Sequence, residues 1–291
     1  MRCAKGPFAR PETPRRQHSG REGAGCGTFR GDVSQGPERM MNLIVDIGNS
    51  RLKAVLMDDG VVARRWVAEA CGVEQLEELL VACPRGERAI VASTCGVDPA
   101  YPACLRGRAD FVVDFDNRTP IPLRNGYGSP ATLGADRLAA AVGGVTLWPG
   151  RNLFIVDFGS AITLDVVTAD GVYRGGSISP GLAMRFRALH DYTGRLPLIG
   201  IEEYRNYREG MVPATTREAM AVGVIEGIVA EVGEWMRRYG RNHAGLVTIF
   251  TGGDAAFFEK RFKSTIFANH DLVLTGLNTI LNYNAEQKNR L

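Results

Sequence analysis

Two short stretches of the sequence place a carboxylate, a glycine and small polar residues between apolar runs. They are Asp46-Ile-Gly-Asn-Ser50 and, later in the chain, Asp157-Phe-Gly-Ser-Ala161. A glycine at such a turn lets the backbone approach a ligand closely and direct its N–H groups at a phosphate, and the serine hydroxyls add donors. Because hard cations prefer oxygen ligands, the two aspartates can bring metal ions to those phosphates. The two stretches therefore predict phosphate binding assisted by cations.

A third glycine turn, Thr251-Gly-Gly-Asp254, stands directly before a predicted helix and suits the nucleoside end of a nucleotide. Lys53 follows the first turn and can add a positive charge there, although a solvated lysine is equally compatible with its strand position. The first turn also has a purely structural interpretation, in which Asp46 accepts hydrogen bonds from the turn backbone of an ordinary hairpin. That stretch alone leaves both interpretations open.

Two further polar groups stand at predicted helix starts. In Gly134-Ala-Asp-Arg137, Asp136 lies near a helix N-terminus, where backbone N–H groups stabilise negative charge. Helix-end electrostatics alone accounts for that acid. Thr215 with Glu218 fits a capping box, which gives the pair Thr215-Thr216 a structural role. Neither group, taken alone, requires a function.

Several common catalytic signatures are missing from the sequence after its N-terminal segment. There is no Gly-x-x-x-x-Gly-Lys-Ser/Thr loop, no protein-kinase catalytic loop and no Gly-x-Gly-x-x-Gly before a helix. His190, His243 and His270 have no mutual motif spacing, and we interpret them as surface or core residues. The six cysteines are scattered, and no pair has metal-site spacing.

Strands must hold the three turns in place, and the apolar pattern predicts them. Residues 41–57 are expected to form a hairpin, residues 61–68 a third strand, and residues 73–83 a helix with Leu76, Leu79 and Leu80 on its buried face. The other predicted strands are residues 88–94, 111–115, 152–156, 162–167, 246–250 and 272–274. The other predicted helices are residues 131–147, 182–189, 216–239, 255–262 and 277–284, with a glycine-rich loop at residues 175–181.

This order of strands and helices indicates an α/β fold. The unit of strand, Asp-x-Gly turn and strand occurs at residues 41–57 and again at residues 152–167, which implies two similar domains that face one another across a cleft. A length of 291 residues also fits two domains. We expect a first domain at residues 41–150 and a second at residues 151–291, each a mixed β-sheet with flanking helices.

The composition is that of a soluble globular protein, with 45% apolar and 23% charged residues. The formal charge of +3 is unevenly distributed, because residues 1–39 hold eight Lys or Arg against four Asp or Glu. Of the 35 basic and 32 acidic residues in the chain, 27 and 28 remain for residues 40–291. A nearly neutral body gives no case for nucleic-acid binding.

Residues 1–40 are rich in Gly, Pro and Arg and have almost no apolar periodicity. We therefore expect a disordered extension ahead of a folded part that begins near Met41. The segment lacks the apolar core of a secretion signal, and the chain has no long uncharged apolar run. The expected location is the cytoplasm, where thiols stay reduced, with no membrane segment.

The motifs together resemble a known family. Two Asp-x-Gly hairpins and a later Gly-Gly-Asp turn are similar to the actin, sugar-kinase and Hsp70 ATPase superfamily, whose fold is a pair of duplicated actin-like (RNase H-like) domains. Within it, residues 42–284 resemble the type III pantothenate kinases. The motifs that carry this resemblance are Asp46-Ile-Gly-Asn-Ser-Arg-Leu-Lys53, Tyr127, Gly134-Ala-Asp-Arg137, Asp157-Phe-Gly-Ser-Ala-Ile-Thr163, Gly175-Gly-x-Ile-x-Pro-Gly181, Thr216-x-Glu-Ala219 and Thr251-Gly-Gly-Asp254.

The resemblance implies an activity, which is ATP-dependent phosphorylation of the primary hydroxyl of pantothenate to 4'-phosphopantothenate. This reaction is the first step of coenzyme A biosynthesis, and the family works as a homodimer. Asp136 would be the general base, and Thr216 would reach pantothenate across the dimer interface. Asp46 would lie near the Mg²⁺ that accompanies ATP, and Asp157 would bind a monovalent cation, K⁺ or NH₄⁺.

The resemblance also implies two sets of binding residues. ATP would contact the first loop, the second loop and the third turn, at Asp46, Ile47, Gly48, Asn49, Ser50, Arg51, Leu52, Lys53, Ser160, Gly252 and Gly253. Pantothenate would contact Tyr127, Gly134, Ala135, Asp136, Arg137 and Thr216. Arg137 would be a partner for anionic charge. Ser50 and Ser160 stand where the family has threonine, and because the hydroxyl is kept we expect activity to survive the change.

Two other functions are compatible with the phosphate loops. The first is a small-molecule kinase of the same superfamily that phosphorylates a sugar or another alcohol, which would lack the set formed by Tyr127 and residues 134–137. The second is a nucleotide-dependent regulatory or assembly protein, since the same fold also serves switches and filaments. The nearly neutral body, the absence of a DNA-reading motif and the base candidate Asp136 disfavour this second function.

Overall fold

The fold was analysed in a computed structural model, which describes residues 41–69, 72–96, 98–200, 203, 204, 210 and 212–290. The expectation for residues 1–40 lies outside the described residues. The strands are β1 Met41–Ile47, β2 Leu52–Asp58, β3 Val61–Ala68, β4 Arg88–Ser93, β5 Phe111–Phe115, β6 Arg124–Asn125, β7 Leu153–Phe158, β8 Ala161–Thr168, β9 Val172–Pro180, β10 Val247–Thr251 and β11 Phe267–Ala268. The helices are α1 Val73–Ala82, α2 Ala100–Arg106, a short 3₁₀ turn Pro130–Thr132, α3 Ala135–Leu147, α4 Leu182–Asp191, α6 Thr216–Asn242, α7 Ala255–Glu259 and α8 Leu272–Asn289.

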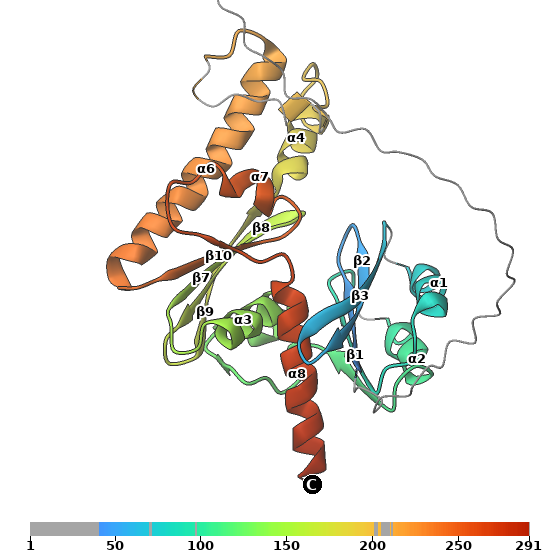
Figure 1. The fold of residues 1–291 in the computed structure, drawn as a ribbon. Coiled ribbons are helices and arrows are strands. Elements are labelled where there is room, and N and C mark those ends of the chain that lie inside the picture. Colours follow the sequence, from blue (N-terminus) through green and yellow to red (C-terminus); the bar gives the residue numbers. More distant parts are fainter. Residues whose placement is uncertain are drawn as a thin grey trace, which may run out of the picture. The chain divides into compact units, whose positions relative to one another are not determined.

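The two sheets share one topology. The first has the strand order β3-β2-β1-β4-β5, and the second has β11-β10-β7-β8-β9-β6 (Figure 1). In each, an antiparallel meander of three strands (β1 to β3, β7 to β9) is extended by two parallel strands (β4 and β5, β10 and β11). Strand β6 adds to the outer edge of β9. The duplication predicted from the two Asp-x-Gly stretches is confirmed, and with it the α/β class.

Alternating side chains along β1 enter two different cores, as expected for a strand covered on both faces. Leu43 and Val45 pack with α1 and α2, and the predicted helix face of Leu76, Leu79 and Leu80 is buried there. The neighbouring residue Ile44 faces the opposite way and joins a cluster in which strand residues pack with α3 and α8. In the second sheet, the face of β7 that carries Phe154 and Val156 packs with α4, α6 and α7.

Helices α3 and α8 pack against each other, and their cluster draws residues from both sheets, among them Ile44 of β1 and Ile155 of β7. The two helices approach closely because glycines stand at their crossing. A Cβ on Gly276 of α8 would lie 1.8 Å from the carbonyl oxygen of Ala139, and a Cβ on Gly143 would lie 2.2 Å from that of Leu272. This crossing fixes α3, whose first turn carries Asp136.

Two predicted elements are wrong. The predicted strand at residues 272–274 is the first turn of α8, because the apolar residues continue at helical spacing through Leu277, Ile280 and Leu281, all buried. The predicted glycine-rich loop at residues 175–181 is mostly strand β9. Its glycines allow close packing within a sheet, since a Cβ on Gly176 would lie 1.5 Å from the carbonyl oxygen of Leu164.

Smaller differences concern element boundaries. Helix α3 begins at Ala135 rather than at residue 131, after the 3₁₀ turn, and α7 ends at Glu259 rather than at residue 262. The short elements α2 and β11 were not predicted. The domain boundary near residue 150 stays a prediction. Strand β6 precedes that point and belongs to the second sheet, whereas α8 follows it and packs on β1, β4 and β5. Among the described residues, no helix has the length and apolar character needed to cross a membrane.

Candidate active site

The first glycine loop connects β1 and β2 and is held by backbone hydrogen bonds. The Gly48 N–H donates to the carbonyl of Arg51 at 2.9 Å, and the Thr94 N–H donates to the carbonyl of Ile47, also at 2.9 Å. Ile47 and Leu52 are fully buried in the core, so their side chains are not available to a ligand. Between them, Gly48 is half-buried, and Asn49, Ser50 and Arg51 form the exposed part of the predicted phosphate loop.

The second glycine loop connects β7 and β8 and lies directly against the first. The Ser50 and Ser160 hydroxyl oxygens are 3.1 Å apart, within hydrogen-bond distance. The Gly181 N–H donates to the carbonyl of Ser160 at 3.1 Å, and a Cβ on Gly181 would lie 2.3 Å from the carbonyl oxygen of Gly159. The structure thus brings together the two serines that the sequence singled out as phosphate ligands.

Asp46 and Asp157 occupy equivalent positions in the two sheets. Asp46 pairs with Lys53 on β2, and Asp157 pairs with Thr163 on β8 and with Thr251 on β10. The predicted third turn follows β10 and reaches the second acid, because a Cβ on Gly252 would lie 2.4 Å from Asp157 Oδ1. Gly252 also has φ +92°, a conformation that favours glycine. Glycine is therefore required here both for space and for backbone conformation.

Both acids have raised pKa values. Burial raises the pKa of Asp46 from 3.8 to about 6, with Lys53 lowering it and Asp136 raising it. Burial likewise raises the pKa of Asp157 to about 7, and the negative charges of Asp136 and Asp46 add to the shift. Asp136 raises the pKa of both other acids, so Asp46, Asp136 and Asp157 lie in one neighbourhood. Desolvation and like charge disfavour ionisation there. A bound cation would relieve both costs.

Asp136 lies in the first turn of α3, as predicted. Its Oδ1 accepts the N–H of Arg137 at 2.8 Å, an interaction that holds the carboxylate at the N-terminal end of the helix. Burial is the main cause that raises the pKa of Asp136, and the charge of Asp165 adds to it. A carboxylate with a raised pKa near two others is the arrangement expected of a general base or a cation ligand.

Arg137, predicted as a partner for anionic charge, is already paired. Its guanidinium is buried, and Nε and Nη2 donate to Asp165 Oδ1 at 3.0 and 2.6 Å. The guanidinium carbon lies 5.9 Å from the centre of the Tyr127 ring. Tyr127 itself packs on Gly175, where a Cβ would lie 2.8 Å from the ring. The structure therefore joins Tyr127 and Arg137, and the positive charge of Arg137 is balanced from within the protein.

Thr216 lies apart from this group. It is the exposed first residue of α6, a helix that packs on α4 and on the second core. The capping box predicted for its neighbour is confirmed, since Thr215 Oγ1 accepts the Glu218 N–H at 3.2 Å and the Glu218 carboxylate accepts the Thr215 N–H at 3.0 Å. The capping box explains Thr215, and the side chain of Thr216 takes no part in it.

Two buried polar residues beside the site were not predicted from the sequence. Asp165 and Tyr173 are both fully buried, and the Tyr173 hydroxyl donates to Asp165 Oδ1 at 2.6 Å. The signal for Asp165 was a single acid inside the apolar strand at residues 162–167, which needs a buried partner. Nothing in the local sequence pointed to Arg137 as that partner.

No three His, Cys, Asp or Glu side chains in the described part of the chain are placed to hold a metal ion by themselves. Mg²⁺ is usually bound by one or two carboxylates together with substrate phosphate oxygens and waters. Asp46 and Asp157 supply hard oxygen ligands of that kind.

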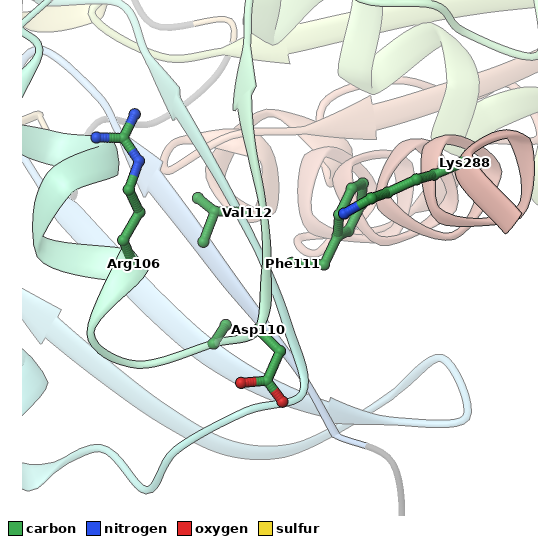
Figure 2. A pocket seen from close by; sticks show the side chains of 6 residues that line it. Arg106, Asp110, Phe111, Val112 and Lys288 are labelled. Carbon is green, nitrogen blue, oxygen red and sulfur yellow. The ribbon is translucent and has the colours of Figure 1, made fainter. Parts of the chain in front are cut away.

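A hollow of 380 Å³ lies at the free edge of β5 and is lined by Arg106, Ala109, Asp110, Phe111, Val112 and Lys288. Figure 2 shows Arg106 and Lys288 on opposite sides of the strand, with Lys288 over the Phe111 ring at 5.1 Å. Their charges do not converge on one point, and we assign no ligand to this hollow.

Comparison with known proteins identifies relatives of the whole folded part. A family model described as type III pantothenate kinase matches residues 42–238. A type III pantothenate kinase of Porphyromonas gingivalis is 41% identical over 251 residues, which is 84% of this chain and 98% of that protein. The corresponding protein of Phocaeicola vulgatus is 37% identical over 247 residues, 84% of this chain and 99% of its own length.

Solved structures show the same fold at lower identity. A protein described as a putative Baf family transcriptional activator from Campylobacter jejuni has a TM-score of 0.57 at 22% identity, covering 84% of this chain and 99% of its own. A ROK family glucokinase from Streptomyces griseus, solved with glucose and AMPPNP, has a TM-score of 0.52 at 11% identity, covering 84% and 98%. At these identities the likeness concerns the fold alone.

The raised pKa of Asp157 leads to a prediction about stability. The folded state holds a proton that the unfolded state releases above pH 3.8, so this carboxyl costs stability as the pH rises from about 4 to about 7. In buffer without nucleotide or metal, Asp157→Asn should raise the free energy of unfolding at pH 8 by roughly 2 kcal/mol, with a smaller gain at pH 4. Urea denaturation at both pH values measures this.

Asp170→Asn is the matched control. Asp170 accepts from the Thr168 hydroxyl at 2.5 Å and pairs with Arg124, which lowers its pKa, so its removal should reduce stability at neutral pH. That loss should fade as the pH falls below the ordinary pKa of the carboxyl. An Asp157→Asn variant that is less stable than the native protein at pH 8 would contradict a desolvated, repelled carboxylate.

Proposed function

This chain belongs to the type III pantothenate kinase family, and from that premise we propose that it transfers the γ-phosphoryl group of ATP to the primary hydroxyl of pantothenate. The observation that carries the proposal is the meeting of the two Asp-x-Gly loops, with Ser50 and Ser160 within hydrogen-bond distance of each other. Both loops lie next to the acids Asp46 and Asp157 and electrostatically near Asp136. A nucleoside triphosphate and an alcohol acceptor can react where these loops and acids meet.

The proposed roles follow from position. Backbone N–H groups of residues 48–51 and of Gly252 and Gly253, with the serine hydroxyls and Lys53, bind the phosphates of ATP. Asp136 accepts the proton of the pantothenate hydroxyl as that oxygen bonds to the γ-phosphorus and the bond to the β-phosphate oxygen breaks, with ADP leaving. Tyr127 and residues 134–137 hold the acceptor. Positioning of donor and acceptor in line supplies most of the acceleration.

The proposal includes bound cations because the carboxylates of Asp46 and Asp157 are suitable ligands for them. Asp46 would hold Mg²⁺ that accompanies ATP, and Asp157 would hold a monovalent cation, K⁺ or NH₄⁺. When bound, such cations neutralise charge that develops on the phosphoryl oxygens. Burial and the charge of Asp136 raise the pKa of both Asp46 and Asp157, and a positive charge bound beside them would favour their ionised forms.

The alternative functions are less well supported. A sugar kinase would share the phosphate loops, and the likeness to the glucokinase is one of fold. A regulatory role is suggested by the description of the Campylobacter protein, but that description applies to that protein, and its likeness too is one of fold. Neither alternative explains why Tyr127 and the turn at residues 134–137 meet at the acids.

The proposed function predicts the kinase activity of the native protein, of one variant and of a control variant. The native protein should convert pantothenate and ATP to a product heavier by one phosphoryl group, detected by mass spectrometry, and should not phosphorylate glucose. Asp136→Asn should lower kcat by at least about 100-fold, because the base is lost, while the dissociation constant for ATP changes by less than about threefold. Asp116→Asn, an exposed acid bonded to Thr119, is the control and should leave turnover unchanged.

Two results would overturn this proposal, and a third would overturn the role of Asp136 within it. Phosphorylation of sugars but not of pantothenate would favour a different kinase of the same fold. ATP hydrolysis that is indifferent to pantothenate would favour a switch protein. Near-native turnover by Asp136→Asn would remove that residue from the base role while leaving the reaction itself in place.

The cation proposal is tested by exchange of salts. With Mg²⁺ held constant, replacing K⁺ by Na⁺ should lower the native turnover by about tenfold, because Asp157 then lacks its preferred partner. Asp157→Asn should show little of this difference, and EDTA should stop turnover in both proteins. Equal rates in K⁺ and Na⁺ would contradict a monovalent-cation site at Asp157.

We also propose a homodimer in which Thr216 of one subunit reaches pantothenate bound by the other. Thr216 is exposed and lies outside the acid group of its own chain. It can therefore contact pantothenate only at the site of a second copy of the chain. Large apolar side chains are exposed on β9 and α4, among them Ile178 and Met184, and such residues are typical of a protein interface.

Complementation of two impaired variants tests the dimer. Asp136→Asn and Thr216→Ala, co-expressed with different tags, should form mixed dimers with one intact site each. At random association the sample should recover about a quarter of the native activity, far above that of either variant alone. A mixed sample no more active than the better single variant, or a monomer by light scattering, would contradict the shared site.

The proposed location is the cytoplasm. Cys83, Cys95 and Cys104 carry free thiols, the state maintained in reducing compartments. Recovery of the protein with a periplasmic marker on cell fractionation would overturn that assignment.

A further inference from the structure

A carboxylate stands in the middle of β8 where the first half of the chain has a core residue. Asp165 pairs with Ile155 on β7, and Val55 pairs with Ile44 on β1. Ile155 and Ile44 each stand two residues before the equivalent acids Asp157 and Asp46, so Asp165 and Val55 hold the same place in the duplicated sheets. Val55 is fully buried and apolar, and Asp165 is equally buried but charged.

Asp165 is tied to the neighbouring elements by a single oxygen. Its Oδ1 accepts from Arg137 Nε at 3.0 Å, from Arg137 Nη2 at 2.6 Å and from the Tyr173 hydroxyl at 2.6 Å. The other oxygen, Oδ2, is buried without a hydrogen-bond partner among the described residues. Charge-assisted bonds of this length hold their partners firmly, and β8, β9 and α3 are thereby joined at one point.

Stability does not explain this arrangement. An apolar residue at position 165, as at Val55, would pack the sheet without the cost of moving a carboxylate and a guanidinium out of water. Replacement of a buried ion pair by apolar residues is often neutral or favourable for stability, so such a pair is weak support for a stabilising role. The pair has a consequence that an apolar contact lacks, which is to fix the orientation of Arg137.

That orientation matters because Arg137 follows Asp136. The Arg137 N–H donates to Asp136 Oδ1 at 2.8 Å, so the peptide that orients the base belongs to the residue whose side chain Asp165 holds. The guanidinium lies 5.9 Å from the centre of the Tyr127 ring, and Tyr127 and Tyr173 meet edge to face with ring centres 6.0 Å apart. The ring of Tyr127 is accommodated by Gly175 of β9, which has φ +87°.

We propose that Asp165, with Tyr173, is a positioning residue that fixes Arg137 and so holds the first turn of α3, the Asp136 carboxylate and the Tyr127 ring in their reactive arrangement. The inference rests on the proposed function and deepens it. Arg137 then has a structural role, because its charge is neutralised by Asp165. The carboxylate of pantothenate is bound by other groups.

The test compares Asp165→Asn and Tyr173→Phe with Asp271→Asn. The control removes an Asp-Arg pair of similar length, since Arg65 Nη2 lies 2.6 and 2.7 Å from the two oxygens of Asp271, away from the acids. Asp165→Asn should lower kcat by about tenfold or more, and Tyr173→Phe by about threefold, because the base is misplaced. The dissociation constant for ATP should stay within about twofold in all three variants, and kcat should be unchanged in the control.

Hydrogen exchange supplies a readout that does not depend on turnover. Backbone amides of residues 135–138 should exchange at least about tenfold faster in Asp165→Asn than in the native protein, and at the native rate in Asp271→Asn. A purely structural role would instead raise exchange throughout β8 and α3 and lower the thermal midpoint without a separate loss of kcat at temperatures where the variant is folded.

The outcomes separate the two levels of the proposal. If the native protein does not phosphorylate pantothenate, the proposed function fails, and hydrogen exchange still reports whether Asp165 holds the first turn of α3. If the native protein is active and folded Asp165→Asn has native kcat, the positioning role is overturned. If Asp165→Asn does not fold, Tyr173→Phe decides, and native kcat and native exchange in that variant overturn the role.

Discussion

Three partly buried carboxylates of like charge, Asp46, Asp136 and Asp157, set the constraint that the rest of this structure must meet. Burial raises the pKa of all three, the charge of Asp136 raises that of Asp46 further, and the charges of Asp136 and Asp46 raise that of Asp157. A fold selected only for stability would separate or replace them. Their retention at one place is explained by the chemistry of phosphoryl transfer, in which cations and a base must stand close to highly charged phosphates.

The duplicated fold brings the acids together. Asp46 and Asp157 stand at equivalent strand positions, and both strands lead into glycine loops that touch through Ser50 and Ser160. The third acid comes from α3, whose close crossing with α8 depends on Gly143 and Gly276. Helix α8 also contacts the first sheet through Asn278, whose side-chain oxygen accepts from Asn42 at 2.7 Å. Each acid is thus placed by a different element, and no single loop makes the site.

Much of this was predictable from the sequence because the signals are local. Apolar runs and Asp-x-Gly turns define both hairpins, and the repeat of the unit reveals the duplication, which the strand orders confirm. The wrong elements are those where a local signal was ambiguous. Residues 272–274 were predicted as a strand because three apolar residues in a row fit either element, whereas they begin α8. The Gly175-Gly176 pair was predicted as a loop because its close neighbours, Tyr127 and Leu164, come from other elements.

In the site too, local motifs were predictable from the sequence, whereas contacts between distant elements were not. Motif resemblance named Asp136, Arg137 and Tyr127, but no sequence pattern could show that Arg137 is neutralised by Asp165, since that pair joins residues from α3 and β8. Likewise, the sequence could propose Ile47 and Leu52 as part of an ATP loop without showing that their side chains belong to the core. Long-range pairing decides which atoms of a motif remain available to a ligand.

The most direct measurement is a crystal structure of the protein with pantothenate and a non-hydrolysable ATP analogue. The proposed mechanism predicts the primary hydroxyl of pantothenate within about 2.6–3.2 Å of an Asp136 carboxylate oxygen and in line with the γ-phosphate. It also predicts the analogue's phosphates between the loops at residues 48–51 and 159–160. Pantothenate bound away from Asp136, or a hydroxyl that faces another acid, would contradict the central claim.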